Sequence, residues 1–514
     1  MTRRFVLFVS LLALASLRAA DDKTAPATTA EELASPTASG TLGASLAAAP
    51  ALSQSNGPDG TVRLSWVEPV TANRYALRCA TLDAKGKKWS APRTIASGPD
   101  LGANSADFPQ LVFGPAGHAT AVWSDGHGGG FLTESADRGS TWSPPVALVL
   151  DGHDVEKISL AVLADGRVLA AWLDGRSRKS GGKARQLFAH VLAAPGLPAE
   201  ASARAGPDVL IDPSVCDCCQ TTLTAFPDGG ALLAYRGRTD EEVRDIRTAR
   251  FRGQAWDDPR PLNYDDWRLA ACPVNGPRLA SDGGRVAVAW FTAADNDPRV
   301  LASYSPDAGA RFLQPLRIDN GKPTGPVDTL ILHDGAMLVT WLESDGSVWL
   351  RRVTPDFAAD APVRLAPAGA TSVKSVPRVA LVRDYAGGKT SAQFVAAFAA
   401  SGEAPLRTLL VTVPEGELLD AEKNCDCAPT AEELQGFPLR GTIAAVAVDR
   451  GVLRVRHDEL PGVLAAGSRE FRVSPDLIAA VQTGREFLGR VERRDGVWWL
   501  FAVRLFAAPV PAQK

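Results

Sequence analysis

The chain has 514 residues, of which 45% are hydrophobic and 22% charged, and its formal net charge is −3. That length exceeds a single ordinary core, so the sequence predicts more than one domain or one large repeat fold. The balanced charge provides no basic surface for nucleic acid, and beyond the N-terminus no apolar stretch is long enough to cross a membrane as a helix. We therefore expect neither a nucleic-acid partner nor a stable membrane span in the mature chain.

The N-terminus has the pattern of an export signal. Arg3 and Arg4 precede an apolar run at residues 5–17, and small residues follow. This pattern is typical of a cleaved signal peptide, with an uncleaved N-terminal anchor as the alternative. We assign residues 1–20 to the signal and expect an exported protein, periplasmic or secreted. Residues 21–50, rich in Ala, Thr, Ser and Pro, are predicted to be a low-complexity linker.

An apolar strand that ends in an aromatic residue recurs seven times between residues 51 and 420. The repeated aromatic residues are Trp66, Trp123, Trp172, Tyr235, Trp290, Trp341 and Phe398. Their spacing of 49 to 63 residues is close to the length of a four-stranded propeller blade, and Gly- and Pro-bearing turns separate the short β-rich runs. The sequence therefore predicts an all-β chain whose residues 51–420 form a β-propeller of six or seven blades.

A second pattern begins after a Cys-containing linker at residues 421–437. Five short β-rich runs and one helix-like stretch, Pro475 to Gln482, lie within residues 438–508. Five strands in about 70 residues are typical of a small barrel of the OB type. We therefore predict a separate OB-like β-barrel at the C-terminus.

Two segments share a turn motif in which a serine, an aspartate, a glycine and an aromatic residue have the same spacing. The motif comprises Ser135, Asp137, Gly139 and Trp142 in one copy and Ser305, Asp307, Gly309 and Phe312 in the other. The Ser and Asp side chains would hydrogen-bond turn amides, Gly would adopt a positive φ, and the aromatic ring would pack into the blade. The motif resembles the Asp-box, or BNR repeat, of the sialidase (neuraminidase) superfamily. This resemblance implies an Asp-box β-propeller in which the boxes are structural.

Family sialidases are glycoside hydrolases with a tyrosine nucleophile backed by a glutamate, an aspartate as acid/base, and three arginines that hold the substrate carboxylate. The densest polar strand of this chain begins at Tyr235, and the Arg-Ile-Pro type motif that provides the family's first arginine is missing. The catalytic residues that the resemblance suggests are Tyr235, Arg236, Arg238, Asp240, Asp174 and Arg176. Further ligand-binding candidates near strand ends are Asp107, Asn275, Arg244 and Asp245.

Each of the main catalytic candidates has a structural alternative. Tyr235 occupies the repeat-aromatic position, so it is also predicted as a core tyrosine. Asp174 and Arg176 could equally form an exposed ion pair or a turn.

The seven cysteines fall into groups, and the densest group comprises Cys216, Cys218 and Cys219. In an oxidising compartment, one of these three is expected to form a disulfide with Cys272. A soft-metal thiolate site, for example for copper(I), is the alternative.

The segment around His457 provides a second resemblance. Residues 456–462, followed by residues 470–473, resemble the small periplasmic copper(I)-binding barrel of metal efflux systems, which implies His457 as a copper ligand. That family also uses methionines, and this chain has none at the corresponding positions. Copper binding by the barrel would therefore require Cys425 and Cys427 as substitutes.

Two functions remain open from the sequence. In the first, the exported propeller binds a glycan or another small ligand at its axial face, either without chemistry or as an exo-α-sialidase-like hydrolase, and no cofactor is implied. In the second, a cell-envelope protein handles copper or exchanges thiols through the Cys cluster and the C-terminal barrel.

Overall fold

The structure is a computed structural model. It describes residues 28–36, 51–54, 61–71, 74–83, 85–99, 101, 107–114, 117–149, 154–182, 184–192, 207–332, 335–354, 358–371, 377–383, 391–400, 406–414, 437–457, 460, 464–494 and 496–505. Within these residues the chain is almost entirely β-structure, with short 3-10 turns at η2 (Arg176–Ser180), η3 (Ala294–Asn296) and η4 (Val448–Arg450). None of the described helices has the length and apolar character needed to span a bilayer.

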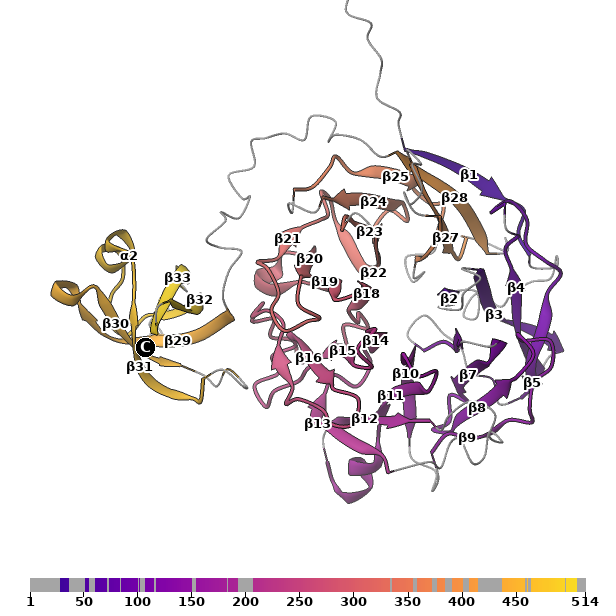
Figure 1. The fold of residues 1–514 in the computed structure, drawn as a ribbon, viewed down its shortest axis with the longest axis horizontal. Coiled ribbons are helices and arrows are strands. Elements are labelled where there is room, and N and C mark those ends of the chain that lie inside the picture. The colour runs from indigo at the N-terminus through magenta and orange to yellow at the C-terminus, as the bar shows by residue number, and fades with distance from the viewer. Residues whose placement is uncertain are drawn as a thin grey trace, which may run out of the picture.

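Seven four-stranded antiparallel sheets, counted over the described residues, form a ring (Figure 1). The first strand of each sheet lies on the inside, because these first strands contact one another around the ring. Blades 1 to 3 comprise β2 (Ala51–Gln54), β3 (Val62–Thr71), β4 (Arg74–Thr81) and β5 (Arg93–Gly98); β6 (Gln110–Phe113), β7 (Ala119–Ser124), β8 (Gly130–Ser135) and β9 (Val146–Ala147); and β10 (Val155–Val162), β11 (Val168–Asp174), β12 (Arg185–Val191) and β13 (Val209–Val215).

Blades 4 to 6 comprise β14 (Thr222–Ala225), β15 (Ala231–Arg236), β16 (Ile246–Phe251) and β17 (Arg260–Pro261); β18 (Arg278–Asp282), β19 (Arg285–Thr292), β20 (Arg299–Ser305) and β21 (Leu316–Arg317); and β22 (Pro323–Ile331), β23 (Met337–Glu343), β24 (Val348–Val353) and β25 (Val363–Ala366). Blade 7 comprises β26 (Arg378–Arg383), β27 (Ser391–Phe398), β28 (Arg407–Pro414) and the N-terminal strand β1 (Thr29–Leu33). The prediction of a propeller is confirmed, with seven blades.

Strand β1 closes the ring and corrects part of the predicted linker. It pairs antiparallel with β28, so that Thr29 lies opposite Thr412 and an N-terminal segment completes the last blade. Only Leu33 of this strand is buried. A single buried side chain leaves almost no hydrophobic pattern, because the strand is held mainly by backbone hydrogen bonds to its neighbour. The composition of residues 21–50 therefore concealed an edge strand at residues 29–33.

The repeated aromatic residue lies on the second strand of every blade, and Trp172, Trp290 and Trp341 are fully buried. In three blades the indole N–H donates to a carboxylate two residues further along the chain. These pairs are Trp66 with Glu68 (3.0 Å), Trp172 with Asp174 (3.0 Å) and Trp341 with Glu343 (2.7 Å). A buried indole needs an acceptor, so the Trp-x-acid pattern lets the ring fill the blade core without an unsatisfied donor.

The two Ser-x-Asp segments form matching turns after β8 and β20. In the first, Ser135 Oγ accepts the Gly139 amide (2.9 Å), while Asp137 Oδ1 accepts the Thr141 amide (2.8 Å). In the second, the Ser305 hydroxyl accepts the Gly309 amide at 2.9 Å. Both glycines have φ near +80°, at +77° and +79°, a conformation that costs other residues steric strain. These side chains therefore hold the turns.

The C-terminal domain is a closed five-stranded barrel of order β29-β30-β31-β33-β32, as the sequence predicted. Its elements are β29 (Phe437–Ala447), β30 (Val452–His457), β31 (Gly467–Arg472), α2 (Pro475–Ala480), β32 (Glu486–Arg494) and β33 (Val497–Leu505). Figure 1 shows the barrel beside the propeller, and an ion pair of 2.8 Å joins Arg440 on β29 to Asp266 after β17. The barrel therefore contacts the ring at blade 4.

Candidate functional site

The inner strands of blades 2 to 7 enclose an axial cavity of about 640 Å³. Two arginines reach it from the first residues of inner strands, Arg278 on β18 and Arg378 on β26. Their guanidinium carbons lie 5.7 Å and 4.3 Å from the ring centroid of Phe108, which precedes β6. A guanidinium over an aromatic face is held by cation–π attraction and leaves its N–H groups free for other acceptors. The cavity therefore contains a pair of arginines assembled around one ring.

Arg378 lacks acceptors for part of its guanidinium. Its exposure is 4%, and its Nε and Nη2 have no hydrogen-bond partner in the structure. Burial without a partner costs free energy for any polar group, and more for a charged one. Arg378 is thus the described cavity residue best prepared to receive an acceptor from outside the chain.

Asp328, on β22 between the two arginine-bearing blades, is the carboxylate nearest to them. Its Oδ1 lies 4.0 Å from Arg278 Nε, and its Oδ2 accepts the Val379 amide at 3.0 Å. Burial raises the pKa of Asp328 to about 6, although Arg278 opposes that shift. Two cations therefore face a single carboxylate that is easily protonated, and this end of the cavity favours an anion.

Asp107, a predicted ligand-binding residue, has its own partners. Its carboxylate accepts the Ser124 hydroxyl and the Lys157 amide (3.1 Å), and it is 7% exposed. Burial raises the pKa of Asp107, against the charge of Lys157. Asp107 therefore supports the loops beside the cavity.

Tyr235, the predicted nucleophile, lies in the core between blades 3 and 4. Its hydroxyl donates to Asp212 (2.6 Å), and the residue is 1% exposed. Burial raises the pKa of Tyr235 well above its usual value, and the charge of Asp212 adds to the shift. A buried phenol held neutral is a poor nucleophile, so the structure agrees with the core alternative.

Arg236 has the same burial, with 1% exposure, and binds three backbone carbonyls. Its Nε donates to Asn275 O (2.9 Å), Nη1 to Arg244 O (2.6 Å) and Nη2 to Phe291 O (2.7 Å). The residue ties blade 4 to blade 5. It is unavailable to a substrate carboxylate in the axial cavity.

Asp174 and Arg176 form the ion pair that was the alternative to catalysis, although the pair is less exposed than expected. Asp174 is 0% exposed, and its Oδ2 accepts Arg176 Nη2 at 2.7 Å. The same Nη2 is 2.9 Å from Asp208. Burial of Asp174 would raise its pKa, but hydrogen bonds from Arg176 and Trp172 outweigh that effect and lower it. The pair is an internal part of blade 3.

A second pocket, of about 790 Å³, lies between blade 4 and the barrel. It brings together the predicted residues Arg238, Asp245 and His457, which are far apart in sequence. Burial, with the charge of Asp265, raises the pKa of Asp245 to about 7. Arg238 is already paired with Glu242 at 2.6 Å.

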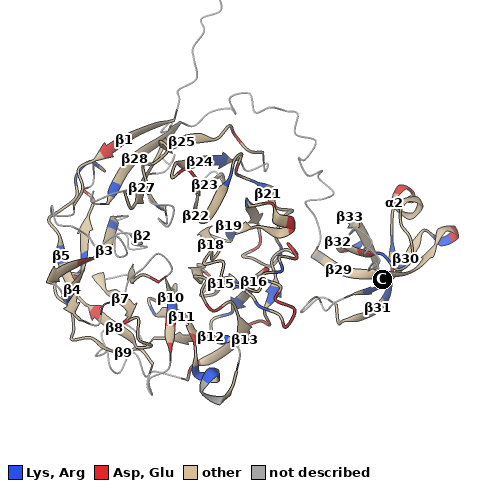
Figure 2. Cartoon of the chain, turned by 180° about the vertical axis from the view of Figure 1, so that it is seen from behind, with Lys and Arg blue, Asp and Glu red and all other residues tan. Residues whose placement is uncertain are grey.

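The remaining predicted polar residues lie apart from both arginines of the axial cavity. Asp240 is exposed, and Arg244 pairs with Glu242. The Asn275 side chain packs against Gly325 and donates to Thr324 O at 3.4 Å. Figure 2 shows Lys and Arg segments and Asp and Glu segments interspersed around the described part of the ring.

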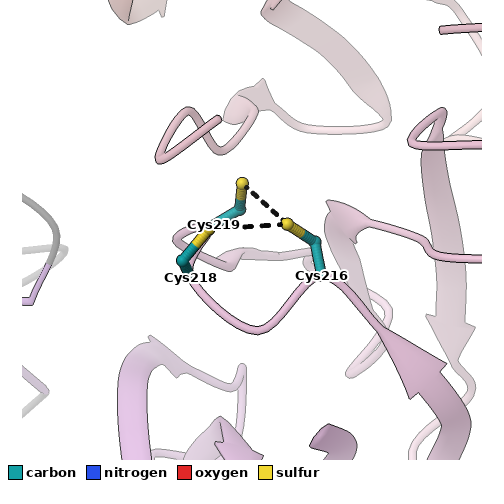
Figure 3. A group of neighbouring side chains, drawn as sticks. All are labelled: Cys216, Cys218 and Cys219. Atoms are coloured by element: carbon teal, nitrogen blue, oxygen red, sulfur yellow. Dashed lines mark hydrogen bonds between the residues drawn. The ribbon is translucent and has the colours of Figure 1, made fainter. Parts of the chain in front are cut away.

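The cysteine cluster is assembled as three neighbouring thiols (Figure 3). Cys216 Sγ lies 3.2 Å from Cys219 Sγ and 3.7 Å from Cys218 Sγ, and all three sulfur atoms are within 4.8 Å of one another. All described cysteines are free. The expected disulfide with Cys272 is not formed, because Cys272 is exposed and lies outside this group.

The barrel does not fit the copper site that the resemblance implied. His457 is 4% exposed and packs edge-on against Phe471, with ring centroids 5.7 Å apart. Residues 437–505 contain no cysteine or methionine, and the hydrophobic core includes Leu464 where a methionine was expected. Cys425 and Cys427 lie outside the described residues. A single imidazole without a soft ligand beside it does not make a copper(I) site.

The residues that the sequence interpretation missed are Arg278, Arg378 and Asp328. A signal for the arginines is present, because Pro277-Arg278 and Pro377-Arg378 each begin an inner strand with the same Pro-Arg-apolar-Ala pattern. The aromatic residues that mark the repeat lie on the second strand of each blade. The Pro-Arg pattern belongs to the first strand, which is the strand that lies at the axis.

No protein-family model matches the chain, and no curated protein matches it. Among solved structures, the BP39L lectin from Burkholderia pseudomallei is similar with a TM-score of 0.52 and 14% identity, over 73% of this chain and 97% of the lectin. The Hadza microbial sialidase Hz136 has a TM-score of 0.36 and 14% identity, over 57% of this chain and 62% of its own. The α-L-arabinanase of Penicillium chrysogenum has a TM-score of 0.38 and 12% identity, over 77% of this chain and 100% of its own. At these identities the likeness to the lectin supports the propeller fold alone.

Proposed function

We propose that the propeller binds an acidic saccharide in its axial cavity without hydrolysing it. The observation that carries this proposal is the buried guanidinium of Arg378, which lines a polar cavity of about 640 Å³ and whose Nε and Nη2 have no hydrogen-bond partner. A planar guanidinium suits the two oxygens of a carboxylate or sulfate. The cavity volume is within the range of ordinary small-ligand sites. The lectin among the similar structures agrees with ligand binding on this fold.

The same cavity does not support the hydrolytic alternative. No tyrosine is present among the described residues that line it. The second carboxylate of the lining, Asp282, lies four residues from Arg278 on an extended strand, roughly 13 Å away, and pairs with Arg285. A glycoside hydrolase needs its two reacting groups on either side of one bond. We therefore expect no turnover of a fluorogenic sialoside.

Calorimetric titration with tetragalacturonate, 3′-sialyllactose and the neutral methyl ester of tetragalacturonate tests the proposal. We expect the purified chain to bind at least one acidic saccharide and not the neutral ester. Arg378→Met should weaken that binding roughly 10- to 100-fold, because hydrogen bonds to charged groups contribute about 1.5–3 kcal/mol. Arg252→Met is the matched control, since Arg252 is 58% exposed on its side chain and pairs with Asp257.

Two results would contradict the proposal: failure of the wild-type chain to bind either acidic saccharide, or binding that Arg378→Met leaves unchanged. Turnover of a sialoside would instead support the hypothesis that the chain is a glycoside hydrolase. The export signal predicted at residues 1–20 lies outside the described residues, and we propose that the mature chain meets its saccharide outside the cytosol.

A further inference from the structure

The cysteine cluster of blade 4 is a built site that saccharide binding does not use. Cys216, Cys218 and Cys219 lie between β13 and β14, in a segment that leads into an inner strand. Cys216 and Cys219 are 1% and 2% exposed, whereas Cys218 is partly exposed. Two of the three residues are thus shielded from water, whereas Cys218 is partly accessible to solvent.

The segment is supported on both sides. The Cys216 amide donates to Arg236 O at 3.0 Å, and the Gly276 amide donates to the Gln220 side chain at 2.9 Å. The backbone of Gly276 approaches Gln220 so closely that a Cβ at that position would lie 2.1 Å from the Gln220 carbonyl oxygen. A segment fixed in this way holds its sulfur atoms in place before any ligand arrives.

The spacing of the sulfur atoms suits metal coordination better than a disulfide. A disulfide requires about 2.05 Å between sulfur atoms, far below the 3.2 Å that separates Cys216 and Cys219. Three thiolates around one ion, with metal–sulfur distances of about 2.3 Å, lie about 4 Å from one another. The observed separations of 3.2 and 3.7 Å need only small adjustments to reach that arrangement.

The charge around the cluster favours an anionic complex. All three hydrogen bonds of Arg236 go to carbonyl oxygens, so no carboxylate neutralises its buried positive charge through them. A cluster of thiolates that exceeds the charge of its metal would balance this arginine.

The ligand set selects the class of metal. The described group contains sulfur alone, with no imidazole or carboxylate oxygen within it. The neighbouring carboxylate of Asp217 is occupied by Arg178 at 2.6 Å and by the Arg185 amide at 2.6 Å. Three soft ligands without a fourth suit a closed-shell monovalent ion better than tetrahedral zinc.

We propose that Cys216, Cys218 and Cys219 form a trigonal thiolate site for one copper(I) ion. Binding involves no change of oxidation state, and the thiol protons that remain are released to solvent as the metal–sulfur bonds form. The site is independent of the saccharide proposal, because it shares none of the arginines of the axial cavity.

The test is anaerobic titration of the fully reduced chain with copper(I) against a chromophoric copper(I) chelator. The chain carries Cys425→Ser and Cys427→Ser, so that the signal reports the cluster alone. We expect one copper(I) per chain, sulfur-only coordination by X-ray absorption, tighter binding of copper(I) than of zinc, and affinity that rises with pH.

Ligand variants and matched controls complete the experiment. Cys218→Ser, at the partly exposed position, and Cys216→Ser should each weaken binding by about 100-fold or more, which exceeds the effect of losing a hydrogen bond to a metal ligand. Cys79→Ser and Cys272→Ser should bind as before, since both residues lie outside the cluster. Circular dichroism confirms that each variant is folded, and silver(I) provides a second probe if copper(I) is oxidised.

Four outcomes would overturn the proposal. The first is reduced, folded chain that takes up no stoichiometric copper(I). The second is binding that survives in Cys218→Ser. The third is a zinc affinity above that for copper(I). The fourth is a Cys216–Cys219 disulfide that forms in air and accounts for the cluster without metal.

Discussion

Blades 3 and 4 are neighbours with the same architecture, but a buried charge is neutralised by an ion pair in blade 3 and has only neutral hydrogen-bond partners in blade 4. In blade 3, Asp174 is fully buried and Arg176 neutralises it directly. In blade 4, Arg236 is equally buried and every one of its hydrogen bonds goes to a neutral carbonyl. Hydrogen-bond satisfaction and charge neutralisation are separate requirements of a buried ion. Blade 3 meets both within itself, whereas blade 4 meets only the first and places thiols beside the unbalanced charge.

The largest expected effect follows from removing that charge. Arg236→Met should destabilise the chain by about 3–5 kcal/mol, because three buried carbonyls lose their donor. Urea unfolding measures this loss, and Arg252→Met should change stability by no more than about 0.5 kcal/mol because its side chain is exposed.

A second variant separates charge from hydrogen bonding at the same position. Arg236→Lys keeps the charge but cannot reproduce the planar fork that reaches three carbonyls. It should lose stability yet keep the rate at which iodoacetamide alkylates the partly exposed Cys218, whereas Arg236→Met should slow that reaction. Equal alkylation rates in the two variants would show that the charge of Arg236 does not affect the thiols, and would contradict the proposed electrostatic difference between blades 3 and 4.

An intermediate effect is expected where blade 5 packs on blade 4. A Cβ at Gly309 would lie 2.6 Å from Leu232 on β15, whereas one at Gly139 in blade 2 would lie 3.4 Å from Trp142. Both glycines have a positive φ. Gly139→Ala should therefore cost about 1–2 kcal/mol from backbone strain. Gly309→Ala should cost about 2–4 kcal/mol because overpacking adds to that strain. Similar losses of stability for both variants would show that Leu232 can move away from the added methyl group at little cost in free energy.

The difference between these blades also explains how far the sequence could be interpreted. The propeller, the repeat aromatics and the barrel were predictable because each depends on periodic burial, which leaves a pattern in one dimension, but the sequence left six and seven blades open. Strand β1 was missed because it buries only Leu33.

The axial arginines were missed for a different reason. Arg278 and Arg378 are 100 residues apart, and only closure of the ring brings both over Phe108. The cysteine cluster was visible because its members are adjacent in sequence. Its free thiols and its distance from Cys272 depend on how the segments around β14 and β18 pack.

The last expected effect concerns pH, and it compares one carboxyl group from each blade. The pKa of Asp245 in blade 4 is raised to about 7 by burial and by Asp265. Its contribution to stability is therefore present below the usual value near 4 and is lost as the pH rises through 7. Asp245→Asn should gain stability relative to the wild type at pH 8 and show little gain at pH 5, since an amide oxygen still accepts the Trp267 amide.

The matched variant in blade 3 should behave with the opposite sign. Because hydrogen bonds from Arg176 and Trp172 hold the pKa of Asp174 below its usual value despite burial, its contribution is present at neutral pH and is lost as the pH falls through the folded-state pKa. Asp174→Asn should thus be less stable than the wild type at pH 7, and the deficit should shrink below pH 4. Thermal unfolding of both variants from pH 3 to pH 8 measures the two trends. If stability changes with pH in the same direction in both variants, the local partners of Asp245 and Asp174 do not determine how each carboxyl group affects stability.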